Sequence, residues 1–585
     1  MQGQPSTGVG AVVRQERIGA VLVLVIENPP VNALGQGVRT GLMAGIDRAE
    51  ADDIRAVVIR GEGRFSAGAD IGEFGRPTQT PVFGTVMDRI EGLGKPVIAA
   101  VTGVALGGGC ELALAAHYRI AEPGALFGLP EVTLGIVPGA GGTQRMPRLI
   151  GAEAALRMML TAKPVTADKA LALGLVDAVA PDALAAALAF AAKGPAVRRT
   201  GEARAGMRDM AGYSAAVAAA RAGLDGALPA AGRIVDCVEA AALLPLPQGL
   251  ELERVAFEDL VTTPQAHGLR YAFFSERRAY AATAGIGKAL TLDRIGVWGA
   301  DGQTADLCSQ ALAAGLTVAL CDPDRGRLVA ALEQIAARQE AAVAAGEMTE
   351  AARESEWTRL TSTLSVDPLA GVDLVLMAPG MEDLGGAVPV VAVGTLPQGM
   401  DAAITVAGAS GLAELALRSD GGSAAGLAMA LARRLQWRVV IGSTLELSLR
   451  AALAEAEVAL EAAGVPAADV AAALAAHGLG SGVPAGQMPA GGAGVVAACL
   501  AAMAAEGARM LMDGRALRPL DIDVVAVQAG LMPRWQGGPM YQADRLGLLV
   551  LRRDLRLQKG GVFAVAGLID NLIAEGKGFA SLDGR

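Results

Sequence analysis

Three continuous apolar runs in the N-terminal part of this chain restrict it to a layered α/β fold. The segments GAVLVLVIEN (19–28), AVVIRG (56–61) and KPVIAAVTG (95–103) are each followed by a helix-like or glycine-rich segment. A strand that is apolar at every position must be covered on both faces, as in parallel sheets flanked by helices. We therefore predict an α/β fold for this part of the chain.

The alternation of strands and helices occurs twice along the 585 residues, and helical sequence follows each time. A second α/β unit begins at RIGVWGADG (294–302), and the glycine-rich stretch 477–494 indicates a domain junction. A chain of this length is expected to form several domains. The predicted domains are 1–190 (α/β), 191–285 (a helical extension with a linker helix), 286–435 (α/β), 436–485 (helical) and 486–585 (helical).

Charge and hydropathy exclude several classes of partner. The net charge is −10 without a basic tract, which argues against nucleic acid or an anionic membrane surface. The apolar run from Val97 to Ala116 contains Glu111, and an ionised carboxylate is costly in lipid, so we interpret this run as buried core rather than a membrane span. Five scattered cysteines without CxxC spacing indicate reduced thiols and no metal site. Since the N-terminus has no signal pattern, we expect a cytoplasmic protein. We further expect either a monomer or a homodimer.

Two glycine-rich loops, FSAGAD (65–70) and LGGGCEL (106–112), each follow a predicted strand. Small residues allow a ligand to approach the backbone closely, so two such loops can present two N–H donors to one thioester oxygen. This oxyanion hole stabilises the enolate character of an α,β-unsaturated thioester. Glu111 follows the triple glycine, and Glu131 lies twenty residues later. Two carboxylates beside an oxyanion hole suit the addition of water across a double bond.

Longer segments around these loops resemble the crotonase (enoyl-CoA hydratase/isomerase) family. They are FSAGADI, GKPVIAAVTGVALGGGCELALAAHYRIA and LPEVTLGIVPGAGGTQRMPRLIG, in the family's order and spacing, and the resemblance covers about residues 10–190. The resemblance implies a crotonase domain, which is a superhelix of ββα units. It also implies an enoyl-CoA substrate, so coenzyme A would enter as part of the substrate.

The resemblance also implies a role for individual residues. The N–H groups of Ala69 and Gly108 would form the oxyanion hole, Glu111 would activate the water, and Glu131 would exchange a proton with C2 of the acyl chain. The neighbouring positions expected to bind substrate are Ala67, Gly68, Asp70, Ile71, Gly107 and Gly109. Family members restricted to isomerisation commonly lack one of the two acids, so both together favour a hydratase.

Structural roles are the alternatives for single residues. Glu111 alone could be an acid at a helix N-terminus, and Glu131 alone could be a partner of Arg145 or Arg148. Asp70 is better interpreted as a helix cap than as a catalyst. His117 follows an apolar helix and is expected in the core or at the surface.

The second half extends the resemblance to the multifunctional β-oxidation enzymes, in which a crotonase domain is fused to a 3-hydroxyacyl-CoA dehydrogenase. The segments that carry it are FFSERRAY (273–280), the second α/β unit and PRWQGGPMYQAD (533–544), the last being specific to these fusions. The resemblance implies a Rossmann-like domain followed by all-helical, dehydrogenase-like domains.

The dinucleotide fingerprint of this half is incomplete. In G-x-G-x-x-G the second glycine admits the pyrophosphate and the third lets helix and strand pack. This chain has GADGQT from Gly299, so Asp301 and Thr304 replace those two glycines, while the expected acid is present as Asp322. The only histidines are His117, His267 and His477, all outside the β-rich part of this domain. Because the loop lacks two of the three glycines, we predict that NAD is not bound. A hydroxyacyl dehydrogenase also needs a base, so we predict that no cofactor is required.

The sequence favours an enoyl-CoA hydratase with an inactive, dehydrogenase-like scaffold. Three alternatives remain at this point. The chain could be a working bifunctional hydratase and NAD-dependent dehydrogenase, or it could perform another crotonase reaction such as isomerisation, thioester hydrolysis or decarboxylation. It could also be a non-catalytic binding protein, against which the paired glutamates argue.

Overall fold

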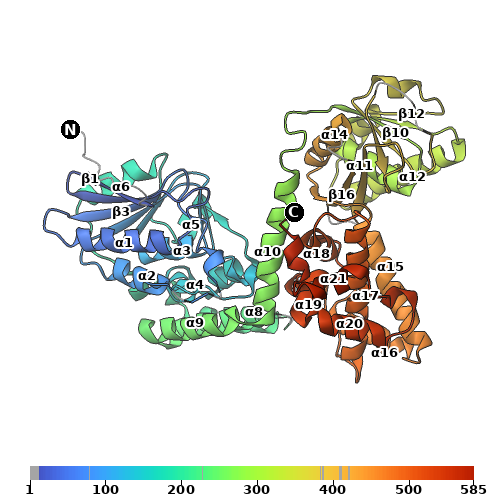
Figure 1. Ribbon diagram of the computed structural model, residues 1–585. Coiled ribbons are helices and arrows are strands. Elements are labelled where there is room, and N and C mark those ends of the chain that lie inside the picture. Colours follow the sequence, from blue (N-terminus) through green and yellow to red (C-terminus); the bar gives the residue numbers. More distant parts are fainter. Residues whose placement is uncertain are drawn as a thin grey trace. The chain divides into compact units, whose positions relative to one another are not determined.

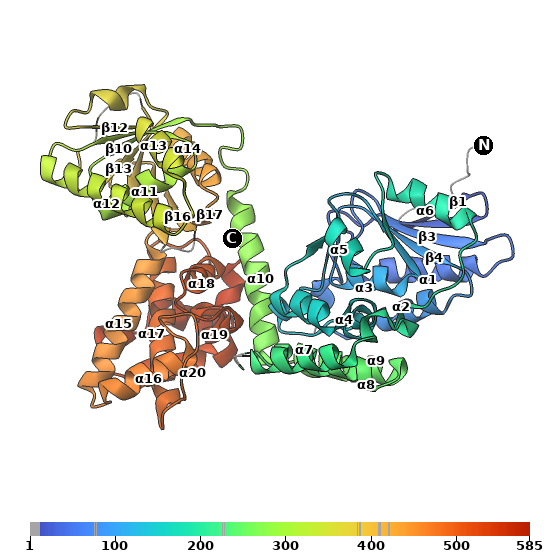
Figure 2. The same cartoon turned by 180° about the vertical axis from the view of Figure 1, so that it is seen from behind.

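The computed structural model describes residues 12–74, 76–77, 79–224, 226, 228–382, 384, 388–407, 411–418 and 422–584. The chain forms two compact units, Met1–Arg270 and Tyr271–Arg585, and the division falls within helix α10 (Pro264–Thr283) (Figure 1, Figure 2). Each unit contains a sheet with covering helices, followed by further helices. The predicted α/β class is therefore confirmed for both halves.

The six-stranded sheet of the first unit has the order β1-β2-β3-β4-β6-β9. Its strands are β1 (Val13–Ile18), β2 (Val21–Ile26), β3 (Ala56–Gly61), β4 (Val97–Val101), β6 (Tyr118–Ala121) and β9 (Ala178–Val179). β1 and β2 pair antiparallel, and the other neighbours pair parallel. The apolar runs of the sequence contain β2, β3 and β4, which confirms them as buried strands.

Helices cover both faces of this sheet, which explains why β2 and β4 are apolar at every position. Val21, Val23 and Val25 of β2 pack in one core cluster with α6 (Ala183–Ala192). The intervening Leu24 lies against Gly45 of α1 (Gln36–Ala49). Since successive side chains of a strand point to opposite faces, α6 and α1 lie on opposite sides of the sheet, as Figure 1 shows.

A smaller, three-stranded sheet lies next along the chain and leads to the candidate site. It is formed by β5 (Val104–Leu106), β7 (Leu126–Gly128) and β8 (Val165–Thr166). β4 and β5 are followed at once by α3 (Gly108–Ala115), which is one ββα unit. The apolar run 97–116 therefore forms two strands and a helix of the fold.

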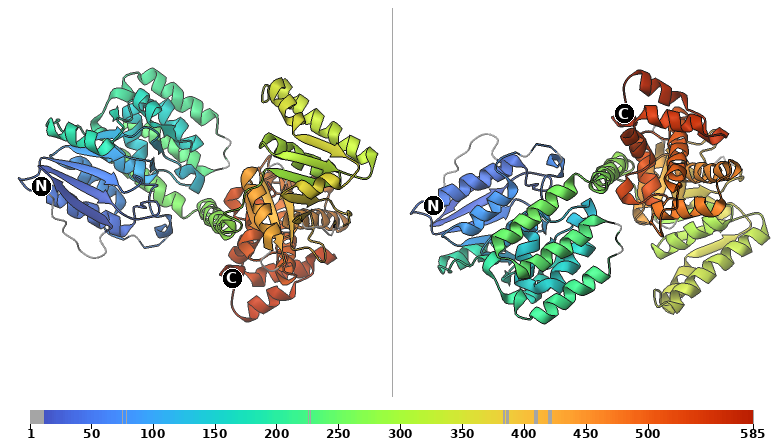
Figure 3. Two further views of the ribbon diagram at one scale, coloured as in Figure 1. Left: turned by 90° about the horizontal axis from the view of Figure 1, so that it is seen from above. Right: turned by 90° about the horizontal axis from the view of Figure 1, so that it is seen from below.

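The remaining helices of the first unit include the predicted helical extension. They are α2 (Phe83–Gly92), α4 (Gly142–Thr161), α5 (Ala167–Leu173), α7 (Met210–Ala222), α8 (Pro229–Leu243) and α9 (Leu246–Val261), with short 3-10 helices η1 (Ile71–Glu73), η2 (Glu131–Leu134), η3 (Thr200–Glu202) and η4 (Ala205–Met207). α8 packs against both α4 and α9, and the green extension helices lie side by side in the right-hand view of Figure 3. The extension thus contacts the helix that follows Glu131.

The second unit begins with an eight-stranded sheet of order β12-β11-β10-β13-β14-β15-β16-β17. Its strands are β10 (Arg294–Trp298), β11 (Thr317–Cys321), β12 (Leu360–Thr363), β13 (Leu374–Met377), β14 (Val390–Val393), β15 (Ala402–Ala407), β16 (Leu412–Leu417) and β17 (Arg438–Ile441). Only β15 and β16 pair antiparallel among the described strands of this sheet. The strand order from β12 to β15 is that of a doubly wound nucleotide-binding fold, which confirms the predicted Rossmann-like domain.

Helices complete the second unit. Those of the sheet region are α11 (Gly302–Ala313), α12 (Arg325–Ala344), α13 (Glu350–Thr358), η5 (Asp367–Gly371) and α14 (Gly422–Arg434), and the helical part contains α15 (Leu445–Ala462), α16 (Ala467–His477), α17 (Gly492–Met512), α18 (Pro519–Gln528), η6 (Arg534–Gln536), α19 (Pro539–Leu546), α20 (Leu548–Leu557), η7 (Gly561–Phe563), α21 (Gly567–Ala574) and η8 (Phe579–Leu582). Among the described residues, only α17 is long and apolar enough to span a bilayer, and 67% of its most apolar stretch is buried inside the protein.

The predicted domain limits near residues 435 and 485 stay predictions. The last strand of the second sheet, β17, lies just beyond residue 435. One apolar core contains Leu449 and Val470 from the first predicted helical domain together with Cys499 and Leu551 from the second. The helices on both sides of the glycine-rich stretch 477–494 therefore share their packing.

Asp523 of α18 anchors the start of the second unit to its helical core. This carboxylate is fully buried and accepts hydrogen bonds from the Tyr271 hydroxyl (2.7 Å), Met540 N (2.8 Å) and Tyr541 N (3.0 Å). The Tyr271 and Tyr541 rings are stacked with their centroids 4.2 Å apart. The PRWQGGPMYQAD motif therefore supplies two backbone amides that bond Asp523. This contact is a structural reason for the sequence of the motif.

We predict that Asp523→Ala lowers the free energy of unfolding of the second unit by about 3 kcal/mol, because it leaves buried donors without an acceptor. All four tryptophans (Trp298, Trp357, Trp437 and Trp535) lie in this unit, so urea unfolding followed by tryptophan fluorescence measures it. Asp469→Ala, at an exposed site on α16, should change stability by less than about 0.5 kcal/mol. Equal midpoints for the two variants would contradict the anchoring role.

Candidate active site

The two glycine-rich loops lie side by side in the first unit. Leu106 N donates to Ser66 O (3.0 Å), which joins loop 65–70 to the segment before α3. A Cβ atom placed on Gly108 would lie 3.0 Å from Ala69 N, and one placed on Gly68 would lie 3.5 Å from Gly108 N. Gly108 is the first residue of α3, so its N–H has no acceptor within the helix. The fold therefore brings together the two amides that the sequence predicts as oxyanion donors.

Close approach and backbone conformation explain the glycines of these loops. Gly68 (φ 120°) and Gly107 (φ 51°) both have positive φ, which disfavours any other residue. A Cβ atom on Gly107 would lie 3.1 Å from Glu131 Oε1, and one on Gly109 would lie 2.4 Å from Ser66 O. Gly107 thus faces a predicted catalytic group, whereas Gly109 is required for packing of the two loops.

The remaining predicted substrate-binding residues have local roles in the loop. Ala67 N donates to Val31 O (3.0 Å), so this amide is already used within the protein. The Asp70 carboxylate accepts from Gly72 N (2.9 Å) at the start of η1, which confirms the predicted helix cap. Ile71 is the first residue of η1 and is partly buried.

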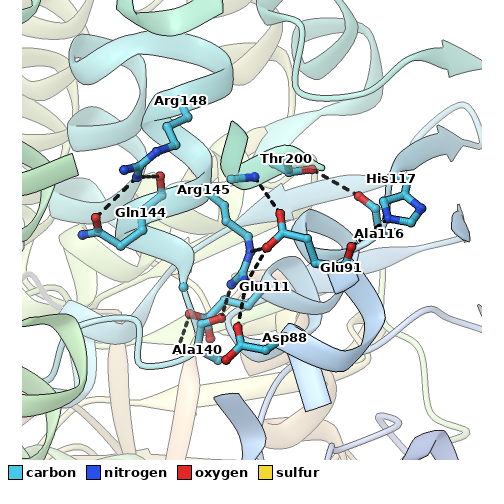
Figure 4. Close-up of polar contacts among 12 residues, drawn as sticks. Asp88, Glu91, Glu111, Ala116, His117, Ala140, Gln144, Arg145, Arg148 and Thr200 are labelled. Carbon is cyan, nitrogen blue, oxygen red and sulfur yellow. Dashed lines mark hydrogen bonds and ion pairs between the residues drawn. The ribbon is translucent and has the colours of Figure 1, made fainter. Parts of the chain in front are cut away.

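Glu111 lies in the first turn of α3 and is only 3% exposed. Its Oε1 atom accepts two backbone hydrogen bonds, from Ala140 N (2.7 Å) and Gly142 N (2.9 Å). Figure 4 shows the Glu111 carboxylate beside Ala140. These donors stabilise the ionised form and hold the carboxylate in one orientation.

Glu131 is the first residue of η2 and is 9% exposed. Its Oε1 atom faces Gly107, and its buried Oε2 atom has no hydrogen-bond partner within the described part of the chain. A buried carboxyl oxygen without a donor is unusual. Glu131 therefore has one oxygen without a donor, on a carboxyl group whose other oxygen faces Gly107.

Burial and mutual repulsion set the protonation of this pair. Burial raises the pKa of Glu111, and the two backbone hydrogen bonds and the charge of Arg145 oppose that rise. Burial raises the pKa of Glu131 well above its ordinary value, and the charge of Glu111 raises it further. When two buried carboxylates share a site, the proton stays on the one with fewer donors. The negative charge is therefore favoured on Glu111 and the proton on Glu131.

A buried arginine supports the segment that holds Glu111 (Figure 4). Arg145 Nη1 donates to Ala140 O (2.9 Å), and its Nε and Nη2 atoms donate to Glu91 Oε2 (3.0 and 2.9 Å). Arg148 donates to Gln144 O (2.6 Å). Among the contacts of the described residues, neither arginine bonds Glu131, so the alternative of an ion pair for that glutamate has no support.

His117 has the predicted core role and takes no part in the site. It is fully buried, and its Nδ1 atom accepts from Val97 N (2.9 Å). The five cysteines are free and buried. Among the described residues no group of three or more His, Cys, Asp or Glu side chains could hold a metal ion, and the absence of a metal site stays a prediction.

A third buried carboxylate at this site, Glu253 of α9, was not predicted from the sequence. It is 1% exposed, and it accepts from Gly141 N and from the amide (2.8 Å) and hydroxyl of Thr143. The spacing of the buried residues of α9 could have indicated this acid. The buried positions of this helix are Gly249, Glu253, Ala256 and Leu260, a spacing that marks one face of a helix. An acid on such a face has to meet donors inside the protein.

The incomplete fingerprint of the second unit has the predicted strand, loop and helix. Gly299 (φ 96°) follows β10, and α11 begins at Gly302. The Asp301 carboxylate accepts from Thr304 N (2.7 Å), and Thr304 Oγ1 accepts from Asp301 N (2.8 Å). In this capping box, side chains of the chain itself bond the amides of Thr304 and Asp301 at the N-terminus of α11.

The acid after the next strand is also engaged within the protein. Asp322 is fully buried and accepts from Ala300 N (2.7 Å). Arg327 donates to both of its oxygens, with Nε 3.0 Å and Nη2 2.9 Å away. Thr304 thus bonds Asp301 and Gly299 O within the loop, whereas Asp322 bonds the amides of Ala300 and Asp324 and the side chain of Arg327.

Comparison with known proteins identifies the family of the chain. The family model "Enoyl-CoA hydratase/isomerase" matches residues 16–193, and "3-hydroxyacyl-CoA dehydrogenase, NAD binding domain" matches residues 294–382. A probable enoyl-CoA hydratase of Bacillus subtilis (strain 168) is 46% identical over 196 residues, which are 30% of this chain and 74% of that protein. The chain belongs to the enoyl-CoA hydratase/isomerase family.

Within this family, the similarity to fused enzymes extends into the second unit. The peroxisomal bifunctional enzyme of Homo sapiens is 36% identical over 375 residues, which are 61% of this chain and 52% of that protein. The Danio rerio enzyme of the same name is 44% identical over 276 residues, or 44% of this chain and 37% of that protein. The chain thus spans about half, or less, of the length of these relatives. The two family models stand in the order expected for the multifunctional β-oxidation architecture, which is confirmed.

We predict that Arg145→Met destabilises the first unit by about 3–5 kcal/mol, because it leaves the buried Glu91 carboxylate without its countercharge. Arg157→Met, on the exposed side of the same helix, is the matched control. Thermal unfolding followed by circular dichroism compares the two. Arg145→Met should unfold at a clearly lower temperature than Arg157→Met. Equal unfolding temperatures would contradict the supporting role of Arg145.

Proposed function

We propose that the first unit hydrates the 2,3 double bond of an enoyl-CoA thioester, as one step of a β-oxidation-type pathway. The observation that carries this proposal is the pair of buried carboxylates with unequal hydrogen bonding beside two neighbouring backbone amides. Membership of the enoyl-CoA hydratase/isomerase family supports it. The coenzyme A would be part of the substrate.

The proposed reaction follows from the charge on each group. The thioester oxygen would accept hydrogen bonds from Ala69 N and Gly108 N, which stabilise the negative charge that develops as the enolate forms. Glu111, ionised and held by two amides, would accept a proton from water as the water oxygen attacks C3. Glu131 would give its proton to C2. One water is consumed, and the two carboxyl groups exchange their protonation states.

The second unit is proposed to be a scaffold without dehydrogenase activity. The residues of its loop do not fit NAD, because the Asp301 carboxylate occupies the helix N-terminus that would receive a pyrophosphate, and Asp322 is paired with Arg327. None of the three histidines of the chain lies in this sheet region. A bifunctional enzyme is the alternative, and the second family model and the names of the relatives favour it.

The acyl group and the compartment are not assigned. The two bifunctional relatives are called peroxisomal, so they lend no support to the cytoplasmic location predicted from the sequence, and that location stays a prediction. The expected monomer or homodimer also stays a prediction, as does the expectation that the chain binds neither nucleic acid nor membrane.

The hydratase proposal predicts that Glu111→Gln and Glu131→Gln each lower hydration by about 10²- to 10⁴-fold, the usual contribution of a positioned acid or base. The wild-type rate should also fall as the pH rises through the raised pKa of Glu131, because this group must carry a proton to protonate C2. Loss of the conjugated-thioester absorbance measures both effects, with straight, branched and ring-bearing enoyl-CoAs as substrates. Glu153→Gln, an exposed glutamate of α4, is the control. Nearly full activity of either site variant at saturating substrate would refute the assignment.

The scaffold proposal predicts no useful NAD binding by the wild-type protein. At ~4 Å and an effective dielectric near 20, one unit-charge repulsion is about 4 kcal/mol, which weakens binding on the order of a thousandfold. Asp301→Gly with Thr304→Gly should recover measurable affinity in calorimetric titration without NADH formation from a 3-hydroxyacyl-CoA. Micromolar NAD binding or steady NADH production by the wild type would instead establish the bifunctional alternative.

A further inference from the structure

Four consecutive backbone amides at the start of α4 are divided between two carboxylates. Ala140 N and Gly142 N donate to Glu111, whereas Gly141 N and Thr143 N donate to Glu253. The first pair holds the predicted water-activating group. The second pair holds an acid from the helical extension, more than a hundred residues away in the chain. The same turn therefore couples the extension to the candidate site.

The packing around this turn leaves little room for it to move. Gly141 has φ 101°, and a Cβ atom on Gly142 would lie 3.0 Å from Glu111 Oε1. On the extension side, a Cβ atom on Gly249 would lie 2.1 Å from Gln144 Oε1, so α9 lies directly against the first turn of α4. Loss of the bonds to Glu253 would release the turn on the side of α9.

Glu253 is not explained by an ion pair. The hydrogen bonds to its carboxylate come from backbone amides and one hydroxyl. By contrast, Glu251 and Glu258 on the same helix are exposed and both pair with Arg254. A buried carboxylate is costly unless it is fully hydrogen-bonded, and an apolar residue would serve packing alone at lower cost. The placement of this acid therefore indicates a specific use of its two acceptor oxygens, which reach the turn 140–143.

We propose that Glu253 is a positioning residue for hydration, which holds the turn 140–143 so that Ala140 N and Gly142 N orient the Glu111 carboxylate toward the attacking water. This inference rests on the proposed hydratase function. The electrostatics agree with it. Burial, and then the charge of Glu111, raises the pKa of Glu253 to about 8, and the charge of Glu253 in turn raises the pKa of Glu131. The charges of Glu111 and Glu253 thus both favour the proton on Glu131.

The test compares two replacements of similar volume. Glu253→Gln keeps one acceptor oxygen for the turn, and Glu253→Leu keeps none. Because misplacement of a catalytic group by about 1 Å costs on the order of a hundredfold in rate, kcat for enoyl-CoA hydration should fall by about 10-fold in the Gln variant and about 100-fold in the Leu variant. KM should change by less than about threefold, since Glu253 contacts the turn and not the substrate. Glu258→Gln, on the exposed face of α9, should behave as wild type.

Hydrogen–deuterium exchange of the full chain separates this inference from the hydratase proposal. Peptides that contain residues 140–143 should exchange faster in Glu253→Gln than in wild type, while peptides from α1 should not change. If the wild type hydrates no enoyl-CoA, the proposed function fails, and exchange alone then decides whether Glu253 holds the turn. Unchanged exchange, unchanged kcat or a rise in KM alone would overturn the proposal.

A milder variant covers the case in which both Glu253 replacements unfold. Thr143→Val keeps the side-chain shape and removes the hydroxyl, which donates to Glu253 and accepts from Gln144 Nε2. It should lower kcat several-fold at constant KM and speed exchange over the same peptide. Wild-type kinetics together with wild-type exchange in this variant would overturn the positioning role.

Discussion

The candidate site depends on the burial of carboxylates that cannot all be ionised together. Glu111, Glu131 and Glu253 lie in the interior of the first unit, where repulsion between like charges is strong. Backbone amides decide which of them keeps the charge. Glu111 and Glu253 each bond two amides of one turn, whereas Glu131 Oε2 has no partner in the described part of the chain. The number of amide donors thereby distinguishes Glu131 from Glu111 and Glu253, although the three side chains are chemically identical.

The N-termini of two helices illustrate how one physical feature can be used in different ways. The first amides of α4 bond two glutamates from distant parts of the chain, and one of these is a predicted catalytic group. At the start of α11 the Thr304 amide is instead bonded locally, in the capping box with Asp301. The strand order of the second sheet does not depend on this loop. The second unit therefore has a Rossmann-like fold whatever the residues of this loop bind.

Sequence reasoning located the site but not its full support. The strands β2, β3 and β4, the two glycine loops, the Asp70 cap and the fingerprint loop follow from local signals, namely apolar runs, glycines after strands and motif spacing. Glu253 was missed because its donors lie more than a hundred residues away in the chain. The predicted limits of the helical domains stay predictions, because α15 to α21 share one core across a glycine-rich stretch that locally indicates a junction.

The sequence by itself determined the fold class, the family and the candidates for the reactive groups, because these depend on residue type and on spacing along the chain. Only the tertiary structure decided the protonation of those groups. Burial, the distance between carboxylates and the number of amide donors are properties of packed segments, and no local pattern encodes them. The unequal environments of Glu111 and Glu131 arise where α3, η2, the start of α4 and α9 meet, and this meeting exists only in the folded chain.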